Sequence, residues 1–143
     1  MSYGSLATIE ALASTWTKAG HFTDSDPYSG GTIPSLTQVN AWIDQMSLVV
    51  DFAIANEGFE TPVVNPTAVA AIADEVEKAV ADLCHAAHKS GRFFTKKALE
   101  SGAPSASAYL TTWVGSRITA FRTLKIPTVT NAVGMGSGSF DVL

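Results

Sequence analysis

Three residues of types that commonly bind metal ions stand close together in the stretch "DLCHAAH". Cys84 and His88 are four residues apart, which places them on one face of a helix, and His85 lies next to Cys84. Zinc prefers thiolate and imidazole ligands, but a zinc site normally needs four ligands. The remaining histidine, His21, is distant in the chain, and there is no second cysteine. We therefore interpret the three as ordinary helix residues and expect no metal and no cofactor.

Neither nucleophilic catalysis nor phosphate binding is supported by the sequence motifs. The chain has many serines but no G-x-S-x-G stretch, and Cys84 falls on the apolar side of its helix, where a thiol is usually inert. Gly134, Gly136 and Gly138 resemble the start of a phosphate loop, but the Lys-Ser/Thr pair of such a loop is missing. These patterns predict that the protein is not an enzyme.

Pairs of acidic residues suggest calcium or acid–base chemistry at two places. Asp24 and Asp26 lie in "HFTDSDPYSGGTIPS", but the further oxygen ligands and terminal Glu of an EF-hand are absent, so we predict an exposed loop. Asp74 and Glu77 belong to a helix, and we expect them to face solvent together with Glu75.

A basic and aromatic cluster is the strongest candidate for nucleic-acid binding. It contains, within nine residues, Lys89, Arg92, Phe93, Phe94, Lys96 and Lys97. Charge with aromatic rings engages phosphates and bases. However, the net charge of the chain is −4, which argues against a dedicated DNA-binding protein. The alternative is that the two phenylalanines pack under a loop while the basic residues face water or an acidic neighbour.

Hydrophobic periodicity predicts the helices that carry these residues. A short helix opens near Ser5, and two long helices cover 35–58 and 66–89. Ser35 or Thr37 can cap the start of the first and Gly58 can end it, and Asn65 with Pro66 can open the second. The first long helix buries a stripe formed by Leu36, Val39, Trp42, Ile43, Met46, Val49, Val50, Ala53 and Ile54. Gly102 and Pro104 are expected to break the chain before a final helix over 108–125. The prediction is an all-α fold, a small helical bundle with an extended C-terminal arm.

Composition and charge favour contacts with other chains. Apolar residues make up 46% of the 143 residues and charged ones 15%, which is little charge for a fully solvated surface. Residues 1–88 carry two basic and eleven acidic groups, a balance of −9, whereas residues 89–143 carry a balance of +5. Such polarity suits head-to-tail contacts between copies, although separately solvated charge explains it equally well. A basic flank between subunits would comprise Lys89, Arg92, Lys96, Lys97, Arg117 and Arg122.

The C-terminal segment 126–143 has one charged residue and three glycines. Because it offers few apolar groups, we expect it to gain order by docking on another protein. The docking side chains would be Ile126, Pro127, Val129, Val133, Met135, Phe140, Val142 and Leu143. The alternative is a terminus without a role.

The chain resembles head-tail connector (adaptor) proteins of tailed bacteriophages. The resemblance rests on the opening "SYGSLATIEALAS", on the layout of the helices, and on the pattern S-x-T-x-V-x-x-W-I-D-Q-x-S-x-x-V-D from Ser35 to Asp51. It implies a connector domain over 1–125, a portal-docking arm over 126–143, and no enzymatic activity.

The same resemblance implies a homo-oligomeric ring, commonly of twelve copies, in the neck of a virion assembled in the host cytoplasm. The ring would lie beneath the portal protein, extend the channel for the genomic DNA without sequence-specific binding, and hold the stopper or tail-completion protein. We expect no membrane segment, because no run of about 18 apolar residues occurs. Two alternatives stay open: a small helical nucleic-acid-binding or regulatory protein using residues 89–97, and another virion part such as a tail-completion protein.

Overall fold

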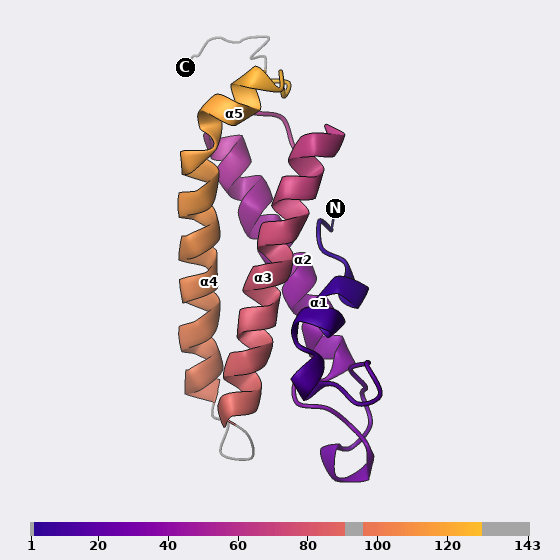
Figure 1. The fold of residues 1–143 in the computed structure, drawn as a ribbon. Coiled ribbons are helices and arrows are strands. Elements are labelled where there is room, and N and C mark those ends of the chain that lie inside the picture. The colour runs from indigo at the N-terminus through magenta and orange to yellow at the C-terminus, as the bar shows by residue number, and fades with distance from the viewer. Residues whose placement is uncertain (1, 91–95, 130–143) are drawn as a thin grey trace.

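Three long helices pack side by side in the computed structural model, which describes residues 2–90 and 96–129 (Figure 1). The α-helices are α1 (Leu6–Leu12), α2 (Leu36–Asn56), α3 (Pro66–Ser90), α4 (Lys96–Ser116) and α5 (Ile118–Thr123). Two 3-10 turns, Ser14–Trp16 and Pro27–Ser29, lie between α1 and α2. Within the described residues no strand forms beyond two isolated bridges. The predicted all-α bundle is confirmed.

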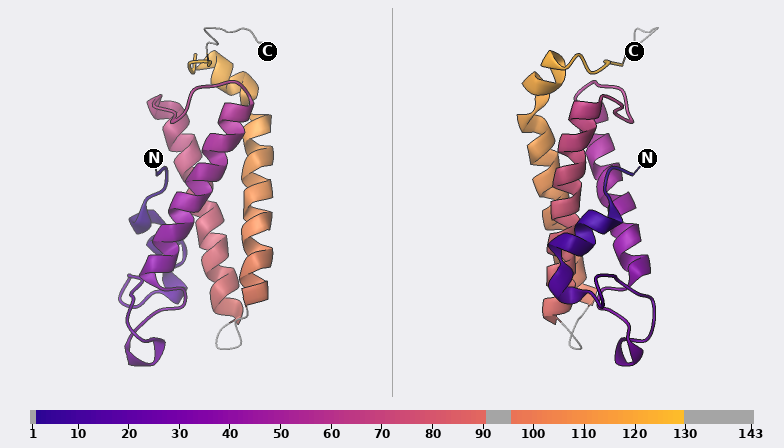
Figure 2. Two further views of the ribbon diagram at one scale, coloured as in Figure 1. Left: turned by 180° about the vertical axis from the view of Figure 1, so that it is seen from behind. Right: turned by 45° about the vertical axis from the view of Figure 1, so that its right-hand side comes forward.

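Helices α2, α3 and α4 each contact the other two, so they enclose one core. The short helix α1 lies against α3 and α2, and α5 turns across the end of the bundle where α2 ends and α3 begins (Figures 1 and 2). On α2 the buried apolar residues are Val39, Trp42, Ile43, Met46, Val50 and Ile54. Their spacing of three and four residues follows the helix period, which is why this stripe faces the core.

Local capping sets the starts of the two long helices. The Ser35 hydroxyl accepts a hydrogen bond from the Gln38 N–H at 3.2 Å, and Asn65 Oδ1 accepts from Thr67 and Ala68 at 3.0 and 3.1 Å. Pro66 at the first helical position needs no donor of its own. Gly58, just past α2, adopts φ 92°, a left-handed conformation that suits glycine. These caps agree with the sequence prediction.

Helix α4 differs from the prediction. It runs without interruption from Lys96 to Ser116, through Gly102 and Pro104, so the expected break is wrong. A proline inside a helix removes one backbone hydrogen bond, which is a local loss. Helix α4 packs against both α2 and α3, and this tertiary packing outweighs that loss.

The segment before α1 is tied to α2 and α3 by polar contacts. The Tyr3 N–H donates to the Ser47 hydroxyl at 3.0 Å, and its phenol donates to Asp51 Oδ1 at 2.5 Å. The Ser5 N–H donates to Glu77 Oε2 at 2.7 Å. Glu77 is therefore mostly buried, and the expectation that it faces solvent with Asp74 is wrong.

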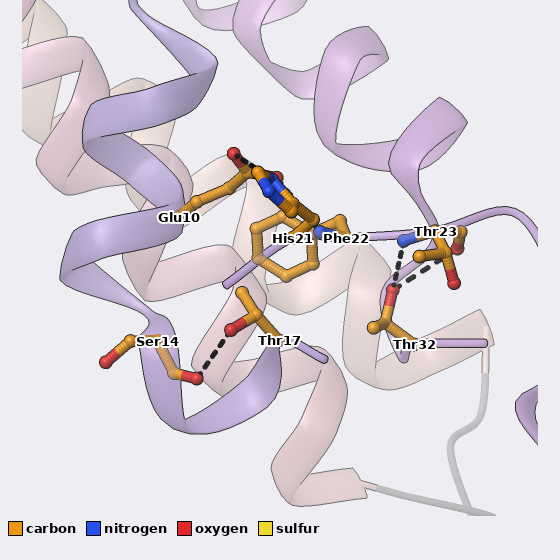
Figure 3. A network of polar contacts seen from close by, with 7 residues as sticks. All are labelled: Glu10, Ser14, Thr17, His21, Phe22, Thr23 and Thr32. Carbon is orange, nitrogen blue, oxygen red and sulfur yellow. Dashed lines mark hydrogen bonds and ion pairs between the residues drawn. The ribbon is translucent and has the colours of Figure 1, made fainter. Parts of the chain in front are cut away.

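The connection between α1 and α2 is held by its own polar network (Figure 3). Glu10 Oε2 accepts from the Phe22 N–H at 3.0 Å, and Glu10 Oε1 lies 3.3 Å from His21 Nδ1. Farther along, the Thr32 hydroxyl accepts from the Thr23 N–H at 2.9 Å. Glu10 thus anchors the start of a loop whose phenylalanine is buried in the core.

Candidate functional site

The outward side of α2 carries apolar side chains that no part of the described chain covers. Phe52 is 73% exposed and Leu48 is 56% exposed, and they lie four residues apart on one face. We define the α2 outer face by the exposed residues Ala41, Asp44, Gln45, Leu48, Phe52 and Ala55. Figure 2 (left) shows α2 at the front of the bundle, with no other helix before it. Fully burying a Leu or Phe side chain is worth about 1.5–3 kcal/mol, so this face favours a protein contact.

Leu48 and Phe52 were not predicted from the sequence. The buried stripe of α2 was predicted, but apolar residues outside that stripe were not considered. A second apolar pair four residues apart, on the side of the helix that also bears Asp44, was the available signal.

Charge around the α2 outer face is acidic. Residues 19–77 contain nine Asp or Glu and no Lys or Arg. Asp44, Glu57 and Glu60 are exposed, and none of them takes part in an ion pair between described residues. An acidic rim beside an apolar strip favours a basic partner surface.

A basic patch lies where α4 passes into α5. We define the α5 basic patch by Arg117, Arg122 and Lys125, which are all exposed. The Arg117 guanidinium lies 5.8 Å from the centre of the half-buried Trp113 ring, a cation–π contact. No Asp or Glu occurs between residues 106 and 129, and none of the three basic side chains is in an ion pair among the described residues.

The predicted basic flank is not one surface. Lys96 and Lys97 open α4, whereas Arg117 follows its last residue and Arg122 belongs to α5. A helix of this length separates its ends by about 30 Å. Lys89 lies near the end of α3, close in sequence to the start of α4. The side chains of Lys89, Lys96 and Lys97, and all of Arg92, Phe93 and Phe94, fall outside the described residues, so the nucleic-acid interpretation stays a prediction.

A groove of about 470 Å³ runs between α3 and α4. It is lined mainly by alanines, Leu83 and the ring of Tyr109, with Lys78 and Asp82 also contributing. The Tyr109 hydroxyl donates to Glu75 Oε1 at 2.6 Å, and this hydrogen bond raises the pKa of the phenol. Glu75 is consequently mostly buried, contrary to the sequence prediction that it points outward.

Lys78 interacts with Glu75 from the solvent side and also with Asp74. Its ammonium lies 2.9 Å from Asp74 Oδ2 and 3.4 Å from Glu75 Oε2. The hydrogen bond to Asp74, with the charge of Glu75, raises the pKa of Lys78. Lys78 is thus engaged by two carboxylates of its own helix and is not free to bind a partner.

Cys84 and His85 of "DLCHAAH" both make structural contacts in the described chain. Cys84 is fully buried, and burial raises the pKa of its thiol to about 12. His85 Nδ1 accepts a hydrogen bond from the Trp16 indole N–H, and the two rings meet edge to face at 5.7 Å. The His88 side chain lies outside the described residues. Among the residues that the structure places, no three His, Cys, Asp or Glu side chains are grouped to hold a metal ion.

Asp24 and Asp26 both stabilise the loop that was predicted around them. Asp24 accepts hydrogen bonds of 2.8 Å from the N–H and from the hydroxyl of Thr37, which lowers the pKa of its carboxyl. Asp26 Oδ1 accepts from the Tyr28 N–H at 2.9 Å. Their carboxylates therefore serve as local caps.

The first part of the predicted docking arm belongs to the body of the protein. Ile126 is 4% exposed and packs in the core, and its N–H donates to the Phe121 carbonyl at 3.0 Å. The Glu60 N–H donates to the Pro127 carbonyl, and the Val129 N–H donates to the Gly58 carbonyl, each at 2.8 Å. The expectation that an arm without a place on its own chain begins at Ile126 is therefore wrong.

The remaining arm residues, Val133, Met135, Phe140, Val142 and Leu143, lie outside the described residues. The described chain reaches Val129, half exposed, at the end of the bundle that α5 covers. Any contact made by residues 130–143 therefore starts from this end.

Comparisons with protein-family models, with curated proteins and with solved structures found no match. In the described chain no helix has the length and apolar character needed to cross a membrane.

Proposed function

We propose that this chain is a head-tail connector of a tailed bacteriophage, a structural protein that joins others of its kind in a ring beneath the portal. The observation that carries the proposal is the α2 outer face. The stretch whose pattern resembles the long connector helix forms one continuous helix, and its exposed side bears Leu48 and Phe52. A chain that functions by binding neighbours needs such an uncovered apolar surface.

The C-terminal end of the described chain supports the same function. Residues 126–129 are fixed at the α5 end of the bundle, so residues 130–143 start from a defined position on the body. An arm that starts there is suited to reach a protein stacked above the ring.

The proposal is tested by mixing the protein with the portal protein of the same phage and measuring the complex by native mass spectrometry. The matched variant ends after Val129, because a cut after Lys125 would remove the core residue Ile126. We expect the full chain to bind the portal and the shortened chain to lose that binding while keeping its helical circular dichroism. Absence of any complex with the full chain, together with normal virion assembly by the shortened chain, would refute the proposal.

A further inference from the structure

We infer that copies of this chain join head to tail, with the α2 outer face of one copy seated against the α5 basic patch of the next. The inference rests on the proposed ring, because it names the contact that would build it. Its two halves lie on different elements of one molecule, and both are exposed.

The apolar part of the contact comes from Leu48 and Phe52. They are among the most exposed large apolar side chains of the described residues, and they are neighbours on one turn of α2. On the opposing surface the half-buried ring of Trp113 lies beside Arg117, which provides an apolar area next to positive charge. Aromatic rings with arginine are enriched at the centres of protein interfaces.

Charge favours one of two possible arrangements of neighbouring copies. If two α2 outer faces met by twofold symmetry, each copy would bring the same acidic surface, with Asp44 on both sides and no lysine or arginine nearby in sequence. A contact between the α2 outer face and the α5 basic patch instead brings Asp44 of one copy towards Arg117, Arg122 and Lys125 of the next. The second arrangement matches unlike charges, and because it joins two different patches it can continue from copy to copy and close into a ring.

Two complementary variants test this contact. The first variant, Leu48→Asp with Phe52→Asp, replaces the two large apolar side chains of the α2 outer face and leaves the basic patch unchanged. The second variant, Arg117→Glu with Arg122→Glu, reverses two charges of the basic patch and leaves the α2 outer face unchanged. All four side chains are exposed or partly stacked at the surface, and circular dichroism checks that each variant remains folded. Leu12→Asp, at an exposed apolar residue of α1, is the matched control.

Sedimentation velocity over a wide concentration range gives the readout. We expect wild type and Leu12→Asp to form species of three or more copies, and each double variant alone to associate at least about thirtyfold more weakly. An equimolar mixture of the two variants retains one intact pair of faces. It should therefore form a species of twice the 15.0-kDa chain mass and nothing larger.

Three results would overturn the inference: wild type that stays monomeric, a first variant that assembles like wild type, or a second variant that forms dimers alone. The portal experiment separates this failure from failure of the connector role. A monomeric chain that binds the portal would refute the proposed contact between copies but not the connector role. Rings that do not bind the portal would refute the connector role but not the contact.

Discussion

The phenol of Tyr3 donates a hydrogen bond of 2.5 Å to Asp51, and the same oxygen accepts one of 2.9 Å from the Val63 N–H. One side chain near the N-terminus thus links α2 to the loop that leads into α3. Tyr3→Phe keeps the ring but leaves the buried Val63 donor unpaired, which costs about 1–3 kcal/mol. Urea denaturation should show this loss as a lower midpoint with an unchanged slope. An unchanged midpoint would mean that the link contributes nothing.

The ionisation of the same hydroxyl should make the folded protein less stable at alkaline pH. Burial, and next the hydrogen bond to Asp51, raise the pKa of Tyr3 above its ordinary value. The folded protein therefore holds this proton more tightly than the unfolded chain does. The resulting stability is complete below about pH 10 and is lost as the pH rises beyond it. Melting temperatures from about pH 9 to about pH 11 should fall more steeply for wild type than for Tyr3→Phe, and parallel profiles would contradict this.

Ile126 and Val129 provide a matched pair that tests where the body of the protein ends. Ile126 is 4% exposed and Val129 is 52% exposed, although they lie on the same short segment. Ile126→Ala should lower the free energy of unfolding by about 2–5 kcal/mol. Val129→Ala should change it by no more than about 0.5 kcal/mol. Equal effects in thermal or urea unfolding would show that the segment is not packed on α5 as described.

Local pattern was sufficient for the two long helices because their apolar period is continuous and their capping residues sit at the expected positions. It was insufficient for α4, since Pro104 acts locally whereas the contacts that sustain the helix come from α2 and α3. For the same reason the packing of Ile126 was not predicted. Its own N–H bonds to Phe121, which is close in sequence, but the residues that follow it, Pro127 and Val129, pair with Glu60 and Gly58, which are distant in sequence.

Buried carboxylates were missed for a related reason. Glu75 and Glu77 have helix positions that pattern alone assigns to solvent, yet their partners are Tyr109 and the Ser5 N–H, each more than thirty residues away. The α2 outer face was visible in principle, because apolar residues outside the buried stripe of a helix can be found by counting. Its complement on α5 needed the structure, which separates Arg117 and Arg122 from the basic residues at the other end of α4.

Cys84 should react with alkylating reagents slowly while the protein is folded. Its side chain is fully buried, and burial raises the pKa of the thiol to about 12, so almost no thiolate forms near pH 8.5, the ordinary pKa of a cysteine. Iodoacetamide labelling followed by mass spectrometry should give one adduct in urea and little in native buffer. Cys84→Ala is the control for the site, since the chain has no other cysteine. Rapid native labelling would show that this part of α3 opens readily.

Gly31 and Gly115 should respond to alanine in opposite directions. A Cβ on Gly31 would lie 1.8 Å from the Ser25 carbonyl oxygen, so the backbone of the loop would have to move, and the hydrogen bond of 2.9 Å from the Gly31 N–H to Asp26 would suffer. We expect a loss of about 1–3 kcal/mol. A Cβ on Gly115 meets nothing within 4 Å, and alanine is the better helix former, so this variant should gain up to about 1 kcal/mol. Thermal unfolding of the two variants beside wild type measures both effects. If Gly31→Ala melts with wild type while Gly115→Ala is stabilised, the close approach of the loop to residue 31 is wrong and the helical assignment at residue 115 stands.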